Sequence, residues 1–311
     1  MEKIKTIFTG TPEFATYYLN AILKDDRFEI IGVVTQSDKP SGRKKEIIPS
    51  AVKKIALENN IPVFQPEKLK EDTKLLETLK CLEPDLMIVV AYGQIIPKEI
   101  LQIFKFGTIN VHPSLLPKLR GASPVQSVIL NGENKTGVTI MLMDEKMDHG
   151  PILSQIELPL TGEETNMDLH KKLADSSREL LIDTIFKYLN KEIEPKEQKH
   201  EEATFCKIIS RENAQINWSK SAEEIKRMIY AFDPWPGTWT TLNNKRVKIF
   251  PPVNVLKNND TLKPGSIVLD YDLKVKCGEG AIKINRLQLE GKKEIEGLEF
   301  INGHKESKHF I

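Results

Sequence analysis

A series of short apolar runs, each followed by a segment with helical spacing, limits the fold of this 311-residue chain more than any other feature. The runs Ile4–Thr9, Phe28–Thr35 and Leu86–Ala91 are almost continuously apolar. Strands that are buried on both faces of a sheet have this pattern, and intervening helices supply the crossovers that parallel strands need. We therefore predict an α/β fold with a Rossmann-like, doubly wound and mostly parallel sheet.

The stretch from Gly107 to Gly121, GTINVHPSLLPKLRG, holds the first candidate catalytic residues. Its β-branched residues predict a strand, which Pro113 ends because proline has no N–H for the ladder. Asn110 and His112 are two residues apart, so they project on the same side of that strand. An amide and an imidazole at a strand end can stabilise an oxyanion by donating hydrogen bonds. The alternative interpretation is a buried pair that closes the turn before Pro113.

Asp148 is the third candidate catalytic residue. It lies 36 residues after His112, in a loop that Gly150 and Pro151 restrain. A carboxylate beside His112 would orient the ring and favour its charged form. The alternatives are a loop carboxylate that caps a turn, or a metal site that also uses Asp144 and His149. No spacing typical of metal ligands supports the metal site, so we expect no metal.

A long loop follows the second apolar run. It reads QSDKPSGRKKEIIPS over residues 36–50 and contains Gly42, Arg43, Lys44 and Lys45. A loop of this length between α/β elements is often functional. Its cations could contact the phosphates of a nucleic acid or nucleotide, or the loop could be a solvated charged surface.

The C-terminal third has a different pattern. Residues 190–206 are charged and predict an exposed linker between a domain at 1–189 and a domain at 207–311. A capping box at Ser221 and Glu224 predicts a helix, and Asn243-Asn244 predicts a hairpin turn. Short strands continue to residue 289, which favours a small β-barrel of OB type, with the tryptophans in its core. Residues 207–311 hold 18 Lys and Arg against 13 Asp and Glu, which modestly favours an anionic partner.

Composition excludes several classes of protein. The net charge is +1, and the three cysteines are too few and too far apart for a disulfide framework. No secretory signal or membrane-length apolar run is present in the sequence, and the glycine fingerprint of dinucleotide-binding proteins is missing after Ile4–Thr9. We expect a cytoplasmic enzyme or binding protein that does not contact a membrane.

Several motifs resemble the methionyl-tRNA formyltransferases, which are folate-dependent formyltransferases. They are FTGTPEFA, VVTQSDKPSGRKK, VVAYGQIIP, INVHPSLLPKLRGASPVQ and GVTIMLMDEKMDHGPIL, and the resemblance extends over essentially the whole chain. Asn110, His112, Asp148 and the SLLP sequence are shared by folate-dependent formyltransferases with different acceptors. His149 and Ser123 depart from the family, which has a small polar residue such as Thr and an Ala at these positions.

This resemblance implies formyl transfer from 10-formyltetrahydrofolate to methionine on charged initiator tRNA. It implies that Asn110, His112 and Asp148 are catalytic and that the folate pocket is lined by Ser114, Leu115, Leu116 and Pro117. It also implies that tRNA is bound by the C-terminal domain and by Gly42, Arg43, Lys44 and Lys45. A monomer is expected. Two rival hypotheses are a formyltransferase for sugar nucleotides or small amines, and a non-catalytic RNA-binding protein on the same fold.

Overall fold

The computed structural model describes residues 2–41, 46–257, 261–269, 271–304 and 309–311. The chain divides into two compact units, each built from several segments. The N-terminal unit contains Met1–Pro124, Thr136–Leu158 and His170–Cys206. The C-terminal unit contains Val125–Lys135, Pro159–Leu169 and Lys207–Ile311.

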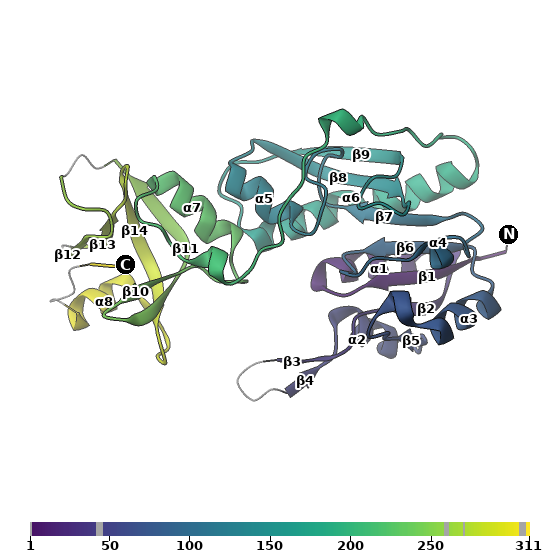
Figure 1. Ribbon diagram of the computed structural model, residues 1–311, viewed down its shortest axis with the longest axis horizontal. Helices are drawn as coiled ribbons and strands as arrows, with labels where there is room; N and C mark the ends of the chain where they lie inside the picture. The colour runs from purple at the N-terminus through teal and green to yellow at the C-terminus, as the bar shows by residue number, and fades with distance from the viewer. Residues whose placement is uncertain (1, 42–45, 258–260, 270, 305–308) are drawn as a thin grey trace. The chain divides into compact units, whose positions relative to one another are not determined.

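The N-terminal unit is built on one sheet (Figure 1), and seven described strands form it in the order β5-β2-β1-β6-β7-β8-β9. Adjacent strands from β5 to β7 in this order are parallel to each other, whereas β8 is antiparallel to β7. This arrangement confirms the predicted mostly parallel α/β sheet. The strands are β1 (Ile4–Gly10), β2 (Phe28–Val34), β5 (Val63–Phe64), β6 (Leu86–Val90), β7 (Thr108–His112), β8 (Lys135–Leu142) and β9 (Ile152–Pro159).

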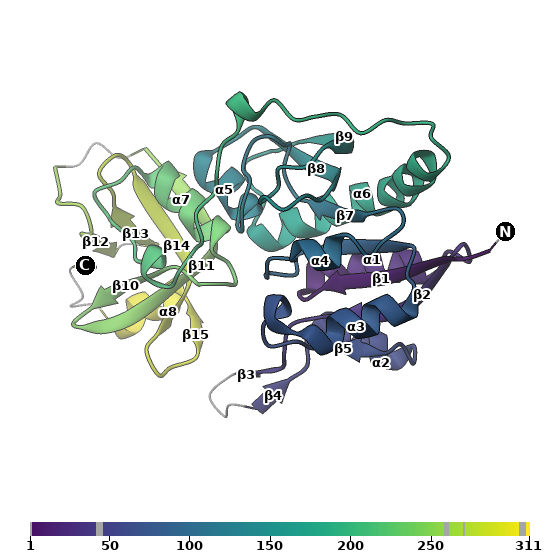
Figure 2. The same ribbon diagram turned by 45° about the vertical axis from the view of Figure 1, so that its right-hand side comes forward.

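Helices cover both faces of this sheet (Figures 1 and 2). On one face, Leu79 of α3 and Ile100 of α4 pack in a cluster with Met87 of β6. On the other face, α1 and α6 contact each other through a 2.7 Å hydrogen bond between Tyr18 Oη and Ser177 Oγ. The helices are α1 (Glu13–Leu23), α2 (Ala51–Glu58), α3 (Thr73–Leu82), α4 (Lys98–Leu101) and α6 (Asn166–Leu189), with short 3₁₀ turns η1 (Leu69–Glu71) and η2 (His200–Glu202).

The long loop after β2 contains a small hairpin. Its strands are β3 (Lys39–Ser41) and β4 (Glu46–Ile48), which pair antiparallel. The hairpin extends away from the sheet of the N-terminal unit (Figures 1 and 2). The candidate tRNA-binding residues Gly42, Arg43, Lys44 and Lys45 lie outside the described residues.

The C-terminal unit holds a curled antiparallel sheet, which is consistent with the predicted OB-type barrel. The described strands follow the order β10-β11-β14-β13-β12, and β15 pairs with β14. Asn243 and Asn244 both have positive φ angles, of 49° and 62°, as the predicted two-residue hairpin turn requires. The strands are β10 (Trp239–Leu242), β11 (Lys245–Leu256), β12 (Ile267–Leu269), β13 (Leu273–Lys276), β14 (Ala281–Leu289) and β15 (Glu294–Glu296).

The core of the C-terminal unit lies between this sheet and α7. The predicted capping box is present, since Ser221 Oγ accepts from the Glu224 backbone and the Glu224 carboxylate accepts from the Ser221 backbone. Ile225 and Ile229 of α7 are buried in the core together with Trp218, as expected, whereas Trp235 is 49% exposed. The helices of this unit are α5 (Pro124–Asn131), α7 (Ala222–Ala231) and α8 (Gly297–Gly303), with a 3₁₀ turn η3 (Glu212–Ala214).

None of the helices in the described parts of the chain is long and apolar enough to cross a lipid bilayer.

Candidate active site

Asn110 and His112 lie on β7, inside the sheet of the N-terminal unit. β7 lies between β6 and β8, with Asn110 opposite Val89 and Met141. This strand forms because every residue from Thr108 to His112 is buried and most of its side chains are apolar or β-branched. The two polar side chains are 8% and 4% exposed. They are therefore shielded from bulk water. Hydrogen-bond donors act most strongly on a developing charge in such a water-excluded site.

The two ring nitrogens of His112 face different protein groups. Nε2 lies 3.0 Å from the Leu119 carbonyl oxygen, so it donates a hydrogen bond to that oxygen. Nδ1 lies 3.6 Å from Oδ1 of Asp148. That separation is too long for a hydrogen bond but short enough for a charged ring to attract the carboxylate. The structure thus brings together His112 and Asp148, which are far apart in the sequence.

Asp148 is held by the backbone of the segment that follows Leu119. Its Oδ2 accepts a 2.7 Å hydrogen bond from the Gly121 N–H. Gly121 has a φ of +114°, and a Cβ there would lie 2.9 Å from the Cys206 carbonyl oxygen. Glycine at this position therefore allows the backbone to approach both Asp148 and Cys206. The Asp148 side chain is 14% exposed, so the carboxylate can still receive a proton from a bound ligand.

The Asn110 amide makes no hydrogen bond to another group among the residues that the structure describes. A nearly buried amide without partners is unusual, because desolvating polar groups costs free energy unless they are paired. A bound molecule with a carbonyl or anionic oxygen would satisfy its two N–H donors. Asn110 is therefore the side chain of β7 that is most available for a ligand.

The segment Ser114–Pro117 forms a tight turn beside β8. Ser114 Oγ donates to the Lys118 carbonyl, and Thr139 Oγ1 donates to the Ser114 carbonyl, both at 2.7 Å. The Gln155 amide donates to the Leu116 carbonyl at 2.8 Å. Ser114 and Leu116 are buried, whereas Leu115 and Pro117 are partly exposed. Only the latter two side chains of the predicted folate-lining segment reach the surface, so any role of the other two is to shape the turn.

The base of the loop that follows β2 is fixed by charged contacts. Lys53 Nζ pairs with Asp38 Oδ2 at 2.5 Å, and the Gln65 amide donates to Asp38 Oδ1 at 2.7 Å. The hydrogen bond from Lys53 lowers the pKa of the Asp38 carboxyl, and the one from Gln65 adds to the effect. The hairpin β3–β4 therefore starts from a defined position.

Family models match both halves of the chain. The model described as "Formyl transferase" covers residues 2–185, and "Formyl transferase, C-terminal domain" covers residues 208–305. A methionyl-tRNA formyltransferase from Clostridium novyi is 42% identical over 97% of each chain. One from Bacillus cytotoxicus is 43% identical over 97% of this chain and 96% of the relative. This chain belongs to the methionyl-tRNA formyltransferase family.

Solved structures of other proteins share this fold. WlaRD, described as a sugar 3N-formyl transferase, has a TM-score of 0.64 and 23% identity, and the match covers 94% of this chain and all of that one. HypX from Aquifex aeolicus in complex with tetrahydrofolic acid has a TM-score of 0.65 and 17% identity. This chain spans about half of HypX, since the match covers 98% of this chain and 48% of that one.

The sequence did not indicate a group of polar residues beside Asp148, of which Arg120 and Gln198 are buried, His149 is half-buried and His200 is exposed. Arg120 and Gln198 are 4% and 5% exposed and are hydrogen-bonded to each other. His149 and His200 stack, with ring centroids 3.9 Å apart and an angle of 7° between the rings. Gln198 and His200 fall in the segment 190–206, which was predicted to be an exposed linker. Paired backbone at Ile152 and Lys196 and at Arg120 and Phe205 holds this segment against the N-terminal unit.

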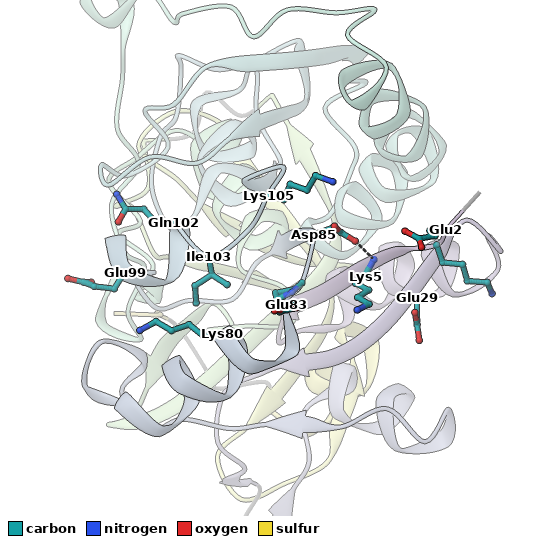
Figure 3. Close-up of a pocket in the computed structure, with 12 residues that line it drawn as sticks. Glu2, Lys5, Glu29, Lys80, Glu83, Asp85, Glu99, Gln102, Ile103 and Lys105 are labelled. Atoms are coloured by element: carbon teal, nitrogen blue, oxygen red, sulfur yellow. Dashed lines mark hydrogen bonds between the residues drawn. The ribbon is translucent and has the colours of Figure 1, made fainter.

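A polar cavity of about 1030 Å³ lies elsewhere in the N-terminal unit (Figure 3). Lys5, Asp85 and Lys105 line it and lie near the beginnings of β1, β6 and β7. Asn110 and His112 lie toward the opposite, carboxyl end of β7. Ligands of open α/β sheets bind at the carboxyl ends of the strands, so this cavity is not the candidate site.

No cluster of three or more His, Cys, Asp and Glu side chains with the geometry of a metal site occurs in the described ranges.

Proposed function

We propose that this chain transfers a formyl group from 10-formyltetrahydrofolate to the α-amino group of methionine esterified to initiator tRNA. The observation that carries the proposal is the identity of 42–43% to methionyl-tRNA formyltransferases over nearly the full length of each chain. The grouping of Asn110, His112 and Asp148 at the end of β7 supports it, because formyl transfer to an amine needs oxyanion donors and a proton acceptor.

In the proposed reaction the neutral amine attacks the formyl carbon, and the electrons of the C=O bond move to oxygen. The Asn110 amide and the Nδ1–H of a protonated His112 donate hydrogen bonds to this oxyanion. An oxyanion donor in comparable sites contributes about 3–4 kcal/mol. The C=O bond then re-forms, the bond from carbon to N10 of the folate breaks, and N10 takes up a proton.

Asp148 has two roles in this proposal. Its carboxylate, 3.6 Å from His112 Nδ1, orients the ring. It also accepts the proton that the attacking nitrogen loses, directly or through water. An α-amino group has a pKa of about 7.7–8.0, so a proton acceptor helps near neutral pH. No covalent enzyme intermediate and no metal are needed for this sequence of steps.

The same proposal assigns the remaining contacts. The Ser114–Pro117 turn shapes the folate pocket, with Leu115 and Pro117 at the surface. Residues 42–45 contact the tRNA near its acceptor end, and the C-terminal unit binds the rest of the tRNA. The enzyme acts as a cytoplasmic monomer.

The test is formyl transfer with three acceptors. The purified chain is incubated with 10-formyltetrahydrofolate and either methionyl initiator tRNA, an amino-sugar nucleotide or free methionine, and formylated product is quantified by mass spectrometry. We expect transfer to methionyl-tRNA alone. Transfer to the sugar nucleotide but not to tRNA would replace this proposal with the small-amine alternative. Binding of tRNA without transfer to any acceptor would favour the non-catalytic alternative.

A further inference from the structure

The loop that carries Asp148 has an unfavourable backbone conformation. Asp148 has a φ of +47°, in the left-handed region, which is uncommon for residues other than Gly although Asp and Asn adopt it more often than other side chains. The adjacent turn is tightly packed as well, because a Cβ on Gly150 would lie 2.1 Å from the Leu142 carbonyl oxygen. Such conformations persist only where surrounding contacts stabilise them, and they cluster at functional sites.

The side-chain amide of Gln198 supplies contacts on both sides of this strained position. Its Nε2 donates to the Asp148 carbonyl at 2.9 Å and to the Gly150 carbonyl at 2.7 Å. Its Oε1 accepts from Nε and Nη2 of Arg120 at 3.2 and 2.6 Å. Both donors and both acceptor positions of the amide are therefore used, which is the full capacity of a glutamine side chain.

Arg120 determines the orientation of that amide. A guanidinium only donates hydrogen bonds, so the amide oxygen of Gln198 must face Arg120 and the NH₂ group must face the loop. Arg120 is held in turn by His200, whose Nδ1 accepts from Nη2 at 2.9 Å. The His200 ring stacks on His149, and His149 Nδ1 lies 2.6 Å from Asp144 Oδ2. His149 lies between Asp148 and Gly150 in the loop. The contacts therefore lead from the loop through Gln198, Arg120 and His200 back to the loop.

Both the backbone and the side chain of Asp148 are thereby restrained. Gln198, oriented by Arg120, holds the Asp148 backbone. Gly121, the residue after Arg120, donates its N–H to the Asp148 carboxylate. We propose that Gln198 is a positioning residue that directs the Asp148 carboxylate toward His112, and that Arg120 and His200 orient the Gln198 amide. This inference rests on the proposed function, because it concerns the carboxylate assigned there as proton acceptor.

Two substitutions separate positioning from mere stabilisation. Gln198→Met keeps the volume but removes every hydrogen bond of the amide. Gln198→Glu keeps an acceptor for Arg120 but removes the NH₂ donor and places a carboxylate against two carbonyl groups. A residue that only satisfies the buried Arg120 would tolerate Glu. For a positioning residue, we expect both variants to lower kcat roughly 10- to 100-fold with the KM for folate within about twofold, because small displacements of catalytic groups have effects of this size.

Ser177→Ala is the matched control, because it removes a buried hydrogen bond of the same unit, to Tyr18, away from the loop. We expect it to lower the melting temperature without changing kcat.

A second measurement needs no substrate: the titration midpoint of the His112 ring is followed by NMR in the unliganded protein. Both Gln198 variants should move this midpoint toward that of Asp148→Asn, and Ser177→Ala should leave it unchanged.

The outcomes distinguish this inference from the proposed function. If the wild-type chain formylates no acceptor, the proposed function is wrong, and the His112 titration alone decides whether Gln198 positions Asp148. If the wild type is active and either kcat or the His112 titration is unchanged in Gln198→Glu, the positioning role is wrong. Should Gln198→Met fail to fold, Gln198→Glu decides the question, because it retains a partner for Arg120.

Discussion

Among single residues, Asn110 offers the clearest separation of activity from stability. Its amide has no hydrogen-bond partner among the described residues, so Asn110→Ala should change the melting temperature little. If the amide donates to the oxyanion, kcat should fall roughly 100- to 1,000-fold. The two quantities can be measured by single-turnover kinetics and calorimetry on the same preparation.

His112→Ala provides the contrast to this prediction. It removes the hydrogen bond to the Leu119 carbonyl, so it should lower both kcat and stability, the latter by about 1 kcal/mol. An Asn110→Ala variant that kept near-normal turnover would remove Asn110 from the oxyanion site.

Cys277 makes stability depend on pH in the alkaline range. It is completely buried in the core of the C-terminal unit, and burial raises the pKa of its thiol to about 12. In the unfolded chain a thiol titrates near 8.5, so above that pH the unfolded state loses a proton that the folded state keeps. The contribution of the buried thiol to the free energy of unfolding is therefore fully present below a pH of about 8.5 and is lost as the pH rises toward 12.

Urea unfolding at pH 7, 8.5 and 10 checks this expectation. The free energy of unfolding should fall more steeply with pH in the wild type than in Cys277→Ala. Equal slopes would mean that the thiol ionises as readily in the folded chain as in the unfolded one. Tyr92, whose pKa is raised to about 12 by burial, is present in both proteins and cancels in the comparison.

Part of the site could be predicted from the sequence. Asn110 and His112 were found because a strand alternates its side chains and Pro113 marks its end. Gln198 was not found, because its burial depends on Arg120 and on two carbonyl groups that are distant in the sequence. Nothing in the composition of its charged neighbourhood indicates such partners.

Among the elements, the buried strands were the easiest to predict. β6 is buried at every position and all five of its residues are apolar, so it stands out in the sequence, and β7 is recognised by its β-branched residues before Pro113. The hairpin β3–β4 was predicted only as a loop, because each of its strands has three residues and one of them contains Pro40, a residue that argues against a strand in a sequence. A short two-stranded hairpin of this kind depends on pairing rather than on a hydrophobic pattern.

The loop between β3 and β4 carries the next prediction. Arg43→Ala should lower kcat/KM for methionyl-tRNA about tenfold or more and leave the KM for 10-formyltetrahydrofolate within about twofold. A cation that contacts phosphate also contributes to the salt dependence of tRNA binding, so the variant should lose less affinity when salt is raised. Kinetics at two salt concentrations test both expectations.

Lys39→Ala is the matched control, since Lys39 belongs to the same hairpin but bonds to Gln36 within the protein. Unchanged tRNA kinetics in Arg43→Ala at both salt concentrations would show that Arg43 does not contact tRNA and would favour the alternative of a solvated charged loop.

For the whole molecule, the fold class followed from the alternation of apolar runs and helical segments, whereas the interleaved segments of the two compact units have no signal in the sequence. The C-terminal unit includes Val125–Lys135 and Pro159–Leu169, which come from within the first 189 residues. Ile129 packs against its core, and Arg227 Nε donates to the Leu130 carbonyl at 3.2 Å. Local sequence cannot predict which unit a helix such as α5 joins, because this depends on packing partners nearly 100 residues away.

A fragment of residues 207–311 should therefore be less stable than the same residues in the full chain. It lacks Ile129, the Leu130 carbonyl that binds Arg227, and the Glu163 carboxylate that pairs with Lys226. Its melting temperature should be lower, and joining residues 124–135 to its N-terminus should restore part of the loss. An equally stable isolated fragment would show that these contacts contribute little.

The interleaving of the two units also has a consequence for synthesis on the ribosome. Residues 125–135 and 159–169 leave the ribosome long before residues 207–311, with which they form the C-terminal unit. At about 5–20 residues per second, the 180 residues that follow α5 take roughly 9–36 s to make. During that interval Ile129 of α5 lacks the core of the C-terminal unit against which it packs, so the nascent chain should expose apolar surface until translation reaches the last strands.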